Sequence, residues 1–317
     1  MPYIQRLPNA LILFITQFLD SSSLSSFIRT CRRFHQIGTP GLYKVPDAEK
    51  VQIFKWALRK SEKRTVAYLA QLIRDIPIAK GKLRAEALTA ACAASSKDAV
   101  AKLLEGTNPC ITEDAEAGKA AIIEAAKGRR RDDAAAIVRS LLTNGANPHA
   151  TDLRGKTALH YAAQRGNRLA ISHLVYDGAE VHKRSKTGMT PILSAAAAGS
   201  YTGVEAMIME GADVNDEDEE GDSVLIKAAN FPEASLVRFL LEMRANKDHV
   251  NGAGRAALSF AAEKGDVRAV EILVNAGCRV KNRDAEGKEA LDYCSTHRNG
   301  AEIGRIISAR ASRPGLR

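Results

Sequence analysis

Apolar residues along most of this chain recur at helical spacing, in pairs of short stretches that repeat at a fixed interval. A glycine marks each repeat and recurs every 33 residues, at Gly155, Gly188, Gly221, Gly254 and Gly287. After it come a first helical stretch with paired alanines and a second amphipathic stretch. One such pair cannot bury its own apolar side, so the pattern predicts stacked helix pairs around a continuous core.

Polar and conformationally special residues fall where such helix pairs need them. Thr157 and Ser223 directly precede a first helix, where a hydroxyl can cap the free amides. Pro191 falls in the first turn of its helix, where a missing N–H costs nothing. Glycines such as Gly178 close the second helix and predict a left-handed C-cap, but Arg244 takes this place in one repeat.

The repeated motif approximates Gly-x-Thr-Pro-Leu-His-x-Ala-Ala, as in residues 155–163 and 188–196, and it resembles the ankyrin repeat. The resemblance is strong over 115–290 and weaker over 51–114, where helical spacing persists without Gly-x-Thr-Pro-Leu. It implies an all-α solenoid with short β-hairpin-like finger turns. We expect degenerate ankyrin-like repeats at 47–114, ankyrin repeats with a C-terminal capping repeat at 115–309, and a flexible basic tail at 310–317.

The first 45 residues do not follow the repeat. Two apolar faces at helical spacing predict two helices, one carrying Leu11, Ile15, Phe18 and Leu19 and the next carrying Leu24, Phe27, Ile28 and Cys31. Residues 32–37 can form a short third helix, which Gly38 and Pro40 end.

This segment, with Leu7-Pro8 at its start and Cys31-Arg32 two residues before Phe34, resembles the F-box, a three-helix module. The resemblance implies that residues 1–46 dock onto the linker subunit of a cullin–RING ubiquitin ligase, while the repeats select a client protein. The docking face would comprise Leu7, Pro8, Leu11, Ile15, Leu24 and Phe27. The alternative interpretation is that these helices only cap the open end of the repeat stack.

Composition supports a helical array and charge suggests its partner. Of 317 residues, 45% are hydrophobic and only 5% aromatic, which suits a core of Ala and Leu in close-packed helices. Residues 155–187 carry six Lys/Arg, whereas residues 188–220 carry eight Asp/Glu and no Lys/Arg. Two interpretations of the acidic turn at 216–220 stay open: it contacts a basic segment of the client, which is our hypothesis, or it is simply a well-solvated turn. The net charge is +9, but no aromatic residues interleave with the basic run at 129–131, so nucleic acid is not expected as a partner.

Ankyrin arrays usually bind partners on their concave face, through the finger turns and the residues after the paired alanines. By this resemblance the client-binding residues are Arg154, Lys156, Arg165, Lys186, Met189, Glu219, Glu220, Asp222, Phe231 and Arg255. Phe231, which precedes a proline, suits two interpretations equally, an exposed apolar anchor or a wedge between helices.

Motifs of catalysis and cofactor binding are missing from the sequence. It holds no Gly-x-Ser-x-Gly, P-loop, Gly-x-Gly-x-x-Gly or His-x-x-x-His, and His160 occupies the structural Leu-His position of its repeat. We therefore expect no enzyme, no cofactor and no metal, although an enzyme with a site in the concavity stays the remote alternative. Five scattered cysteines and a longest apolar stretch of nine residues favour a cytoplasmic or nuclear protein without a membrane partner.

Overall fold

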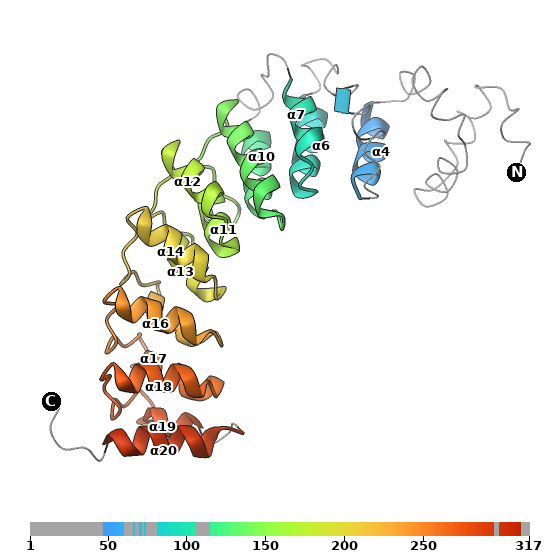
Figure 1. Ribbon diagram of the computed structural model, residues 1–317. Coiled ribbons are helices and arrows are strands. Elements are labelled where there is room, and N and C mark those ends of the chain that lie inside the picture. Colours follow the sequence, from blue (N-terminus) through green and yellow to red (C-terminus); the bar gives the residue numbers. More distant parts are fainter. Residues whose placement is uncertain are drawn as a thin grey trace, which may run out of the picture.

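The computed structural model describes residues 47–59, 66, 70, 71, 73, 81–105, 115–294 and 298–311. Over these residues the chain forms a curved array of paired helices that follows the order of the sequence (Figure 1). The predicted F-box-like module at 1–46, with its docking residues, lies outside the described residues. The last helix continues through Ala311, two residues into the segment 310–317 that the sequence assigns to a tail.

Fifteen helices lie in the described part of the chain. The first five are α4 (Asp47–Arg59), α6 (Gly81–Ala93), α7 (Lys97–Leu104), α9 (Ala115–Ala126) and α10 (Arg131–Thr143). Pairs at 33-residue spacing follow: α11 (Ala158–Arg165), α12 (Arg168–Tyr176), α13 (Pro191–Ala197), α14 (Tyr201–Met209), α15 (Val224–Ala229), α16 (Ala234–Glu242), α17 (Ala257–Lys264) and α18 (Val267–Asn275). The array ends with α19 (Ala290–Tyr293) and α20 (Gly300–Ala311).

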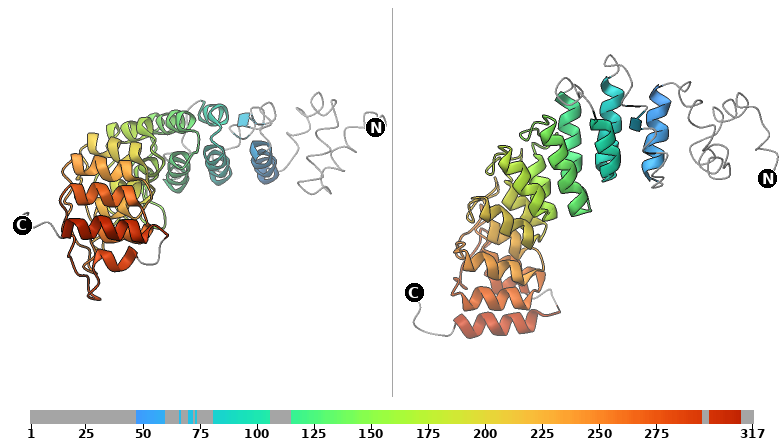
Figure 2. Two further views of the ribbon diagram at one scale, coloured as in Figure 1. Left: turned by 60° about the horizontal axis from the view of Figure 1, so that its bottom comes forward. Right: turned by 45° about the horizontal axis from the view of Figure 1, so that its top comes forward.

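The helices form two layers, which the turned views separate (Figure 2). The first helix of each pair packs on the first helix of the next, giving an inner layer of α6, α9, α11, α13, α15, α17 and α19. The outer layer has two closely packed runs, α7–α10–α12–α14 and α16–α18–α20. Between these runs, Tyr201 of α14 and Phe239 of α16 bring their rings to 5.0 Å between centroids.

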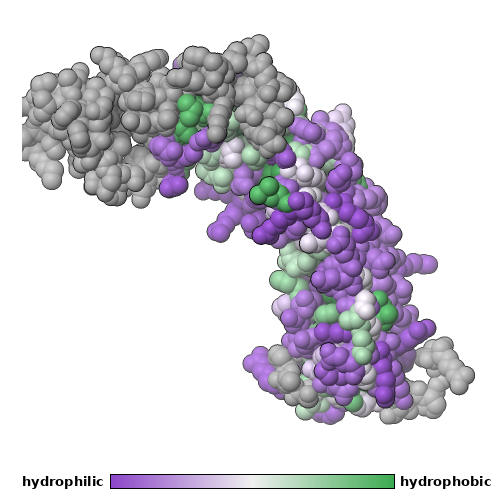
Figure 3. Space-filling view, turned by 180° about the vertical axis from the view of Figure 1, so that it is seen from behind, coloured by the Kyte–Doolittle hydropathy of each residue, from purple (hydrophilic) through white to green (hydrophobic). Residues whose placement is uncertain are grey.

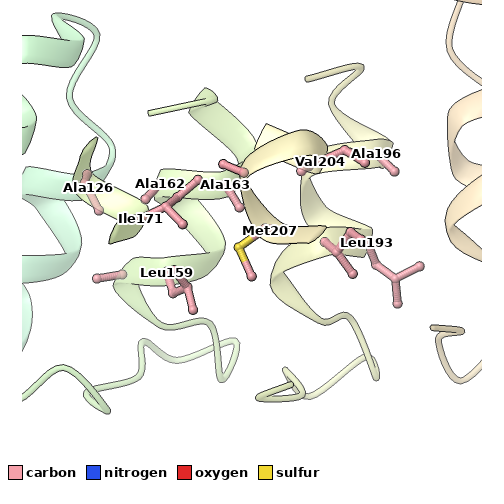
Figure 4. Packing of buried hydrophobic residues seen from close by; sticks show 14 of the residues in the cluster. Ala126, Leu159, Ala162, Ala163, Ile171, Leu193, Ala196, Val204 and Met207 are labelled. Atoms are coloured by element: carbon pink, nitrogen blue, oxygen red, sulfur yellow. The ribbon is translucent and has the colours of Figure 1, made fainter. Parts of the chain in front are cut away.

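The core is one connected cluster of small and aliphatic side chains that extends from Val51 in α4 to Ile307 in α20. Figure 4 shows part of it, where Leu159, Ala162 and Ile171 lie next to Met207 of the following repeat. The small residues let helices approach closely: a Cβ placed on Gly203 of α14 would lie 2.0 Å from the carbonyl oxygen of Ala163. The sequence prediction of a continuous Ala- and Leu-rich core is thus confirmed.

The predicted caps are present in part, since the Thr157 hydroxyl contacts His160 Nδ1 at 2.9 Å instead of a helix amide. The Ser223 hydroxyl accepts a hydrogen bond from the Ile226 N–H at 3.3 Å, and Pro191 begins α13. Gly178 closes α12 with φ +92°, and Arg244 takes the same left-handed conformation with φ +64° at the end of α16. Since a side chain with a Cβ is strained there, Arg244 marks a locally unfavourable turn in an otherwise regular array.

The segments between successive pairs are finger turns, and three of them are closed by single antiparallel bridges, Thr151 to Thr157, Glu217 to Ser223 and Val250 to Ala256. Adjacent fingers are tied by backbone hydrogen bonds, such as Lys186 N–H to the Arg154 carbonyl at 2.9 Å. No strand longer than a bridge occurs in the described residues, which confirms hairpin-like fingers without a sheet.

The face shown in Figure 3 is mostly hydrophilic, with small separate hydrophobic spots among the residues that are coloured. No described helix combines the length and the apolar character that a bilayer crossing requires.

Candidate protein-binding surface

Except at Gly188, where Ser185 takes the place, each finger is held by one Asp or Asn side chain three residues before its glycine. The Oδ1 atom of this residue accepts the N–H groups two and four residues further on, as at Asp152, with 2.8 Å to Arg154 and 2.9 Å to Lys156. The same pair of bonds, at 2.9–3.1 Å, recurs at Asp218, Asn251 and Asp284. These bonds satisfy turn amides that would otherwise need water, so they fix the shape of the fingertip.

The inner helices reach back to the same carboxylates. The Tyr161 hydroxyl of α11 donates to Asp152 Oδ2 at 2.5 Å, and the Tyr293 hydroxyl of α19 donates to Asp284. Burial and this hydrogen bond raise the pKa of Tyr161 to about 12. The fingers at Gly155 and Gly287 are thereby fastened to the helices that follow them.

The finger of residues 213–222, here called the acidic finger, is fastened by a buried ion cluster. Lys227 Nζ of α15 lies 2.7 Å from Asp218 Oδ2 and 2.6 Å from Asp222 Oδ2, and Asn251 Nδ2 donates to Asp222 Oδ1 at 2.7 Å. Burial disfavours the ammonium charge, but the two carboxylates outweigh it and raise the pKa of Lys227. The cation therefore stays charged and holds the base of the acidic finger.

A further carboxylate makes this the one described cluster with metal-ligand spacing. Oxygen atoms of Asp218, Glu220 and Asp222 lie within 4.8 Å of one another. The Lys227 ammonium already forms ion pairs with Asp218 and Asp222, so a structural role accounts for these two carboxylates.

His160 links two repeats through its ring. Nδ1 accepts the Thr157 N–H at 3.1 Å, so Nε2 carries the proton and donates to the Met189 carbonyl at 2.9 Å. Burial lowers the pKa of His160 to about 4 and keeps the ring neutral. The structural interpretation of His160 from the sequence is confirmed.

Comparison with protein families gives one match. The model for ankyrin repeats matches residues 122–218 and 219–312, which together make up more than half of the chain. This chain belongs to the ankyrin-repeat family. Ankyrin arrays are interaction modules and typically non-enzymatic, so this array is expected to bind another protein.

Solved ankyrin domains share the fold. The human ASB11 ankyrin repeat domain is 24% identical, with a TM-score of 0.59 over 72% of this chain and 99% of that one. The Bcl-3 domain is also 24% identical, with a TM-score of 0.52 over 69% and 97% of the two chains. A domain from Acinetobacter baumannii is 27% identical, with a TM-score of 0.52 over 61% and 98%. No curated protein sequence gives a significant match.

The ankyrin surface presents the predicted basic residues in two ways. Arg154, Lys186 and Arg165 are exposed, the first two at fingertips and the third at the end of α11. Lys156 and Met189 are half-buried, and the Lys156 ammonium lies 5.9 Å from the centroid of the Tyr161 ring. Of the predicted basic residues in this part of the array, Arg154, Lys186 and Arg165 are therefore the accessible ones.

The predicted acidic residues separate into structural and exposed groups. Glu219 and Glu220 point from the tip of the acidic finger and are exposed. Glu217 is also exposed and lies 3.3 Å from His249 Nε2. Asp222 is buried and bonded to Lys227, so it supports the finger and we leave it out of the contact surface.

Arg255 and Phe231 have neighbours within the chain. The Arg255 guanidinium stacks between the rings of Phe260 and Tyr293, at 4.1 and 4.2 Å from their centroids, and donates to Glu263. The Phe231 side chain packs on the turn at Gly199, where a Cβ would lie 2.2 Å from the ring. Phe231 still exposes 39% of its surface, so it is both packed on the preceding repeat and accessible.

Sequence reasoning missed the residues that hold the fingers. Asp152, Asp218, Asn251 and Asp284 each stand three residues before a repeat glycine. Lys227, Tyr161 and Tyr293 all stand six residues after a repeat glycine. Reading the sequence by repeat position would have brought these pairs to light.

The described cysteines are structural. Cys92, Cys278 and Cys294 are buried free thiols, and burial raises the pKa of each. Thiols in this state are poor nucleophiles and behave as small apolar side chains.

Proposed function

We propose that the ankyrin array binds a client protein through its fingers and inner helices, and that the acidic finger contacts a basic segment of that client. The observation that carries this proposal is that the carboxylates of the acidic finger have two different roles, one buried and structural, the other exposed. Asp218 and Asp222 are buried and share an ion pair with Lys227 at its base, whereas Glu217, Glu219 and Glu220 are exposed at its tip. A rigid turn that presents carboxylates loses little conformational entropy on binding a cationic partner.

Charges of opposite sign follow one another along the proposed surface, so it can orient a bound segment. Arg154 and Lys186 are exposed on the two fingers that precede the acidic finger, and the Arg184 guanidinium bridges to the acidic finger through the Glu217 carbonyl at 2.7 Å. A client segment with basic and acidic ends would therefore bind in one orientation, and the opposite orientation would bring like charges together.

A charge reversal tests the acidic finger. The probe is a labelled peptide with several Lys/Arg, titrated into the full chain at two salt concentrations. We expect Glu219→Lys/Glu220→Lys to weaken binding at least about tenfold and to flatten the salt dependence. Glu242→Lys/Glu271→Lys, exposed on the outer helices, is the matched control and should change affinity less than about twofold. Equal losses in both variants, or no loss in the first, would contradict the proposal.

The adaptor role rests on the resemblance of residues 1–46 to the F-box. We propose that this module docks onto the linker subunit of a cullin–RING ubiquitin ligase and that the array holds the client near the ubiquitin-conjugating enzyme. The chain itself would catalyse nothing; it would raise the effective concentration of the client at the ligase.

Co-expression with the linker subunit, followed by size exclusion, tests this role. Wild type should co-elute with the subunit, and Leu7→Asp/Pro8→Asp should elute alone. Leu153→Asp, at a leucine that is 92% exposed on a finger, is the control and should co-elute like wild type. If wild type elutes alone, the chain is an ankyrin scaffold without a ligase partner, and the acidic-finger proposal is unaffected.

A further inference from the structure

The edge of the array formed by the turns between inner and outer helices carries a second charged surface. Five arginines lie in or directly beside two neighbouring turns: Arg129, Arg130 and Arg131 where α9 is followed by α10, and Arg165 and Arg168 where α11 is followed by α12. We call this group the arginine edge. All five side chains are exposed. In Figure 1 the turns between inner and outer helices follow the inner side of the bend, and the fingers follow the opposite side.

Contacts between successive turns make the edge continuous. Asn167 Nδ2 donates to the Arg131 carbonyl at 2.8 Å, which joins the two arginine-bearing turns. Thr202 Oγ1 donates to the Gly166 carbonyl at 3.2 Å, which joins the second of these to the turn at Gly199. The Phe231 ring covers Gly199 and brings an exposed aromatic side chain to the same edge.

The cations of the arginine edge are largely uncommitted. In the part of the chain that the structure describes, Arg129, Arg131 and Arg165 form no ion pair. Arg130 lies 3.8 Å from Asp133 and Arg168 lies 3.9 Å from Glu205, and both arginines are mostly exposed. Such exposed pairs contribute little free energy and exchange readily for other partners.

We propose that the arginine edge and Phe231 bind one extended protein segment in which acidic residues are followed or preceded by an apolar residue. Arginine forms paired, parallel hydrogen bonds with carboxylates, whereas Lys127 of the first turn is already paired with Glu124 at 2.6 Å. Phe231 lies two turns beyond the Arg165 turn, about 16–20 Å at ordinary helix spacing. An extended segment of about five or six residues spans that distance.

Protein carboxylates suit this surface better than nucleic-acid phosphates. No aromatic residue stands within either arginine-bearing turn to stack a base. Two turns of cations followed by an apolar contact match a short acidic segment with an apolar residue.

The arginine edge is independent of the acidic finger. The two lie at opposite ends of the inner helices, and they attract opposite charges. One client with a basic and an acidic segment could contact both, and each contact would then raise the effective concentration of the other. The proposal does not require this, since either surface can bind alone.

Labelled peptides and the full chain test the proposal by fluorescence anisotropy. The probe is a block of glutamates, a Gly/Ser spacer of about six residues and a terminal Leu-Phe, made in both orders. We expect Arg129→Glu/Arg130→Glu to lower the affinity for the tighter-binding of the two peptides at least about tenfold. Arg238→Glu/Arg268→Glu, exposed on outer helices with the same change of charge, should weaken it less than about twofold. Glu219→Lys/Glu220→Lys should not weaken it, which separates this test from that of the acidic finger.

A second variant tests the apolar contact. Phe231→Ala should weaken binding of the Leu-Phe peptide about three- to tenfold and leave the affinity for a Ser-Ser version of the peptide unchanged. Comparing both peptides on both proteins is a double-mutant cycle for this contact. Thermal unfolding of each variant checks that the array remains folded. Failure of both peptide orders to bind, equal losses in the matched control, or tighter binding of a single-stranded RNA with a steeper salt dependence would each overturn the proposal.

Discussion

His160 is a titratable side chain that the fold keeps neutral. An unfolded imidazole takes up a proton as the pH falls through about 6.5, whereas the buried ring does so only near 4. Between these values the unfolded chain binds more protons, so the free energy of unfolding falls as the pH is lowered. The contribution of His160 is therefore complete above about pH 6.5 and is lost progressively toward pH 4.

Replacing His160 should reduce this pH dependence. His160→Leu removes the bonds to Thr157 and Met189, and we expect it to cost about 1–3 kcal/mol at pH 7.5. Urea unfolding between pH 4 and 7.5 should show a smaller loss of stability on acidification than in wild type. His149→Gln, at an exposed histidine, is the control and should keep the wild-type slope. An unchanged slope in His160→Leu would contradict the linkage.

Arg244 is the second residue whose conformation predicts a measurable effect. It holds φ +64° at a helix end where the equivalent residues of other repeats, such as Gly178 and Gly211, are glycines. Arg244→Gly should therefore stabilise the array by about 1 kcal/mol, because glycine takes this conformation without steric cost. Arg244→Ala keeps the Cβ and should not stabilise; a gain in both variants would point to the arginine charge instead. Urea denaturation midpoints decide between them.

At the scale of a single element, the acidic finger depends on one lysine. Asp218 and Asp222 expose only 5% and 11% of their side chains, and Lys227 exposes 16%. Lys227→Met would leave two buried carboxylates without a cation, and we expect it to cost about 3 kcal/mol. Adding Asp222→Asn should recover part of this loss, and Lys264→Met, at an exposed position of α17, should have little effect. If Lys227→Met unfolds like wild type in urea, the cluster does not hold the finger.

The elements differ in how far the sequence predicts them. Repeat spacing, paired alanines and caps such as Ser223 depend on local chemistry, so the helix pairs and hairpin-like fingers are predicted well. Contacts between repeats are harder to predict from the sequence, because Phe231 contacts Gly199, and Asn251 contacts Asp222, across about one repeat of sequence. Acidic residues that look alike in the run at 216–220 also divide into buried and exposed ones, since only some of them lie within reach of Lys227.

At the scale of the whole molecule, the stabilising contacts join each repeat to its neighbours along the array. Each inner helix packs on the preceding and following inner helices, and hydrogen bonds between fingers also join only adjacent repeats. A binding surface spread over several fingers is therefore only as rigid as the repeats beneath it. The acidic finger and the arginine edge both lie within α9–α16, flanked on each side by further helices that shield them from fraying ends.

This linear arrangement predicts that a destabilising core substitution loosens only the repeats near it. Ile303 of α20 is fully buried, and Ile303→Ala should cost about 2–5 kcal/mol at that end. Amide hydrogen exchange should accelerate in α18–α20 and stay unchanged in α9–α12, because nearest-neighbour coupling weakens with each repeat. Ile137→Ala, at a buried residue of α10, is the matched variant: it should accelerate exchange in α9–α12 and leave α18–α20 unchanged. If either change accelerates exchange throughout, the array unfolds as one cooperative unit, and both proposed surfaces would then respond to a core substitution anywhere along it.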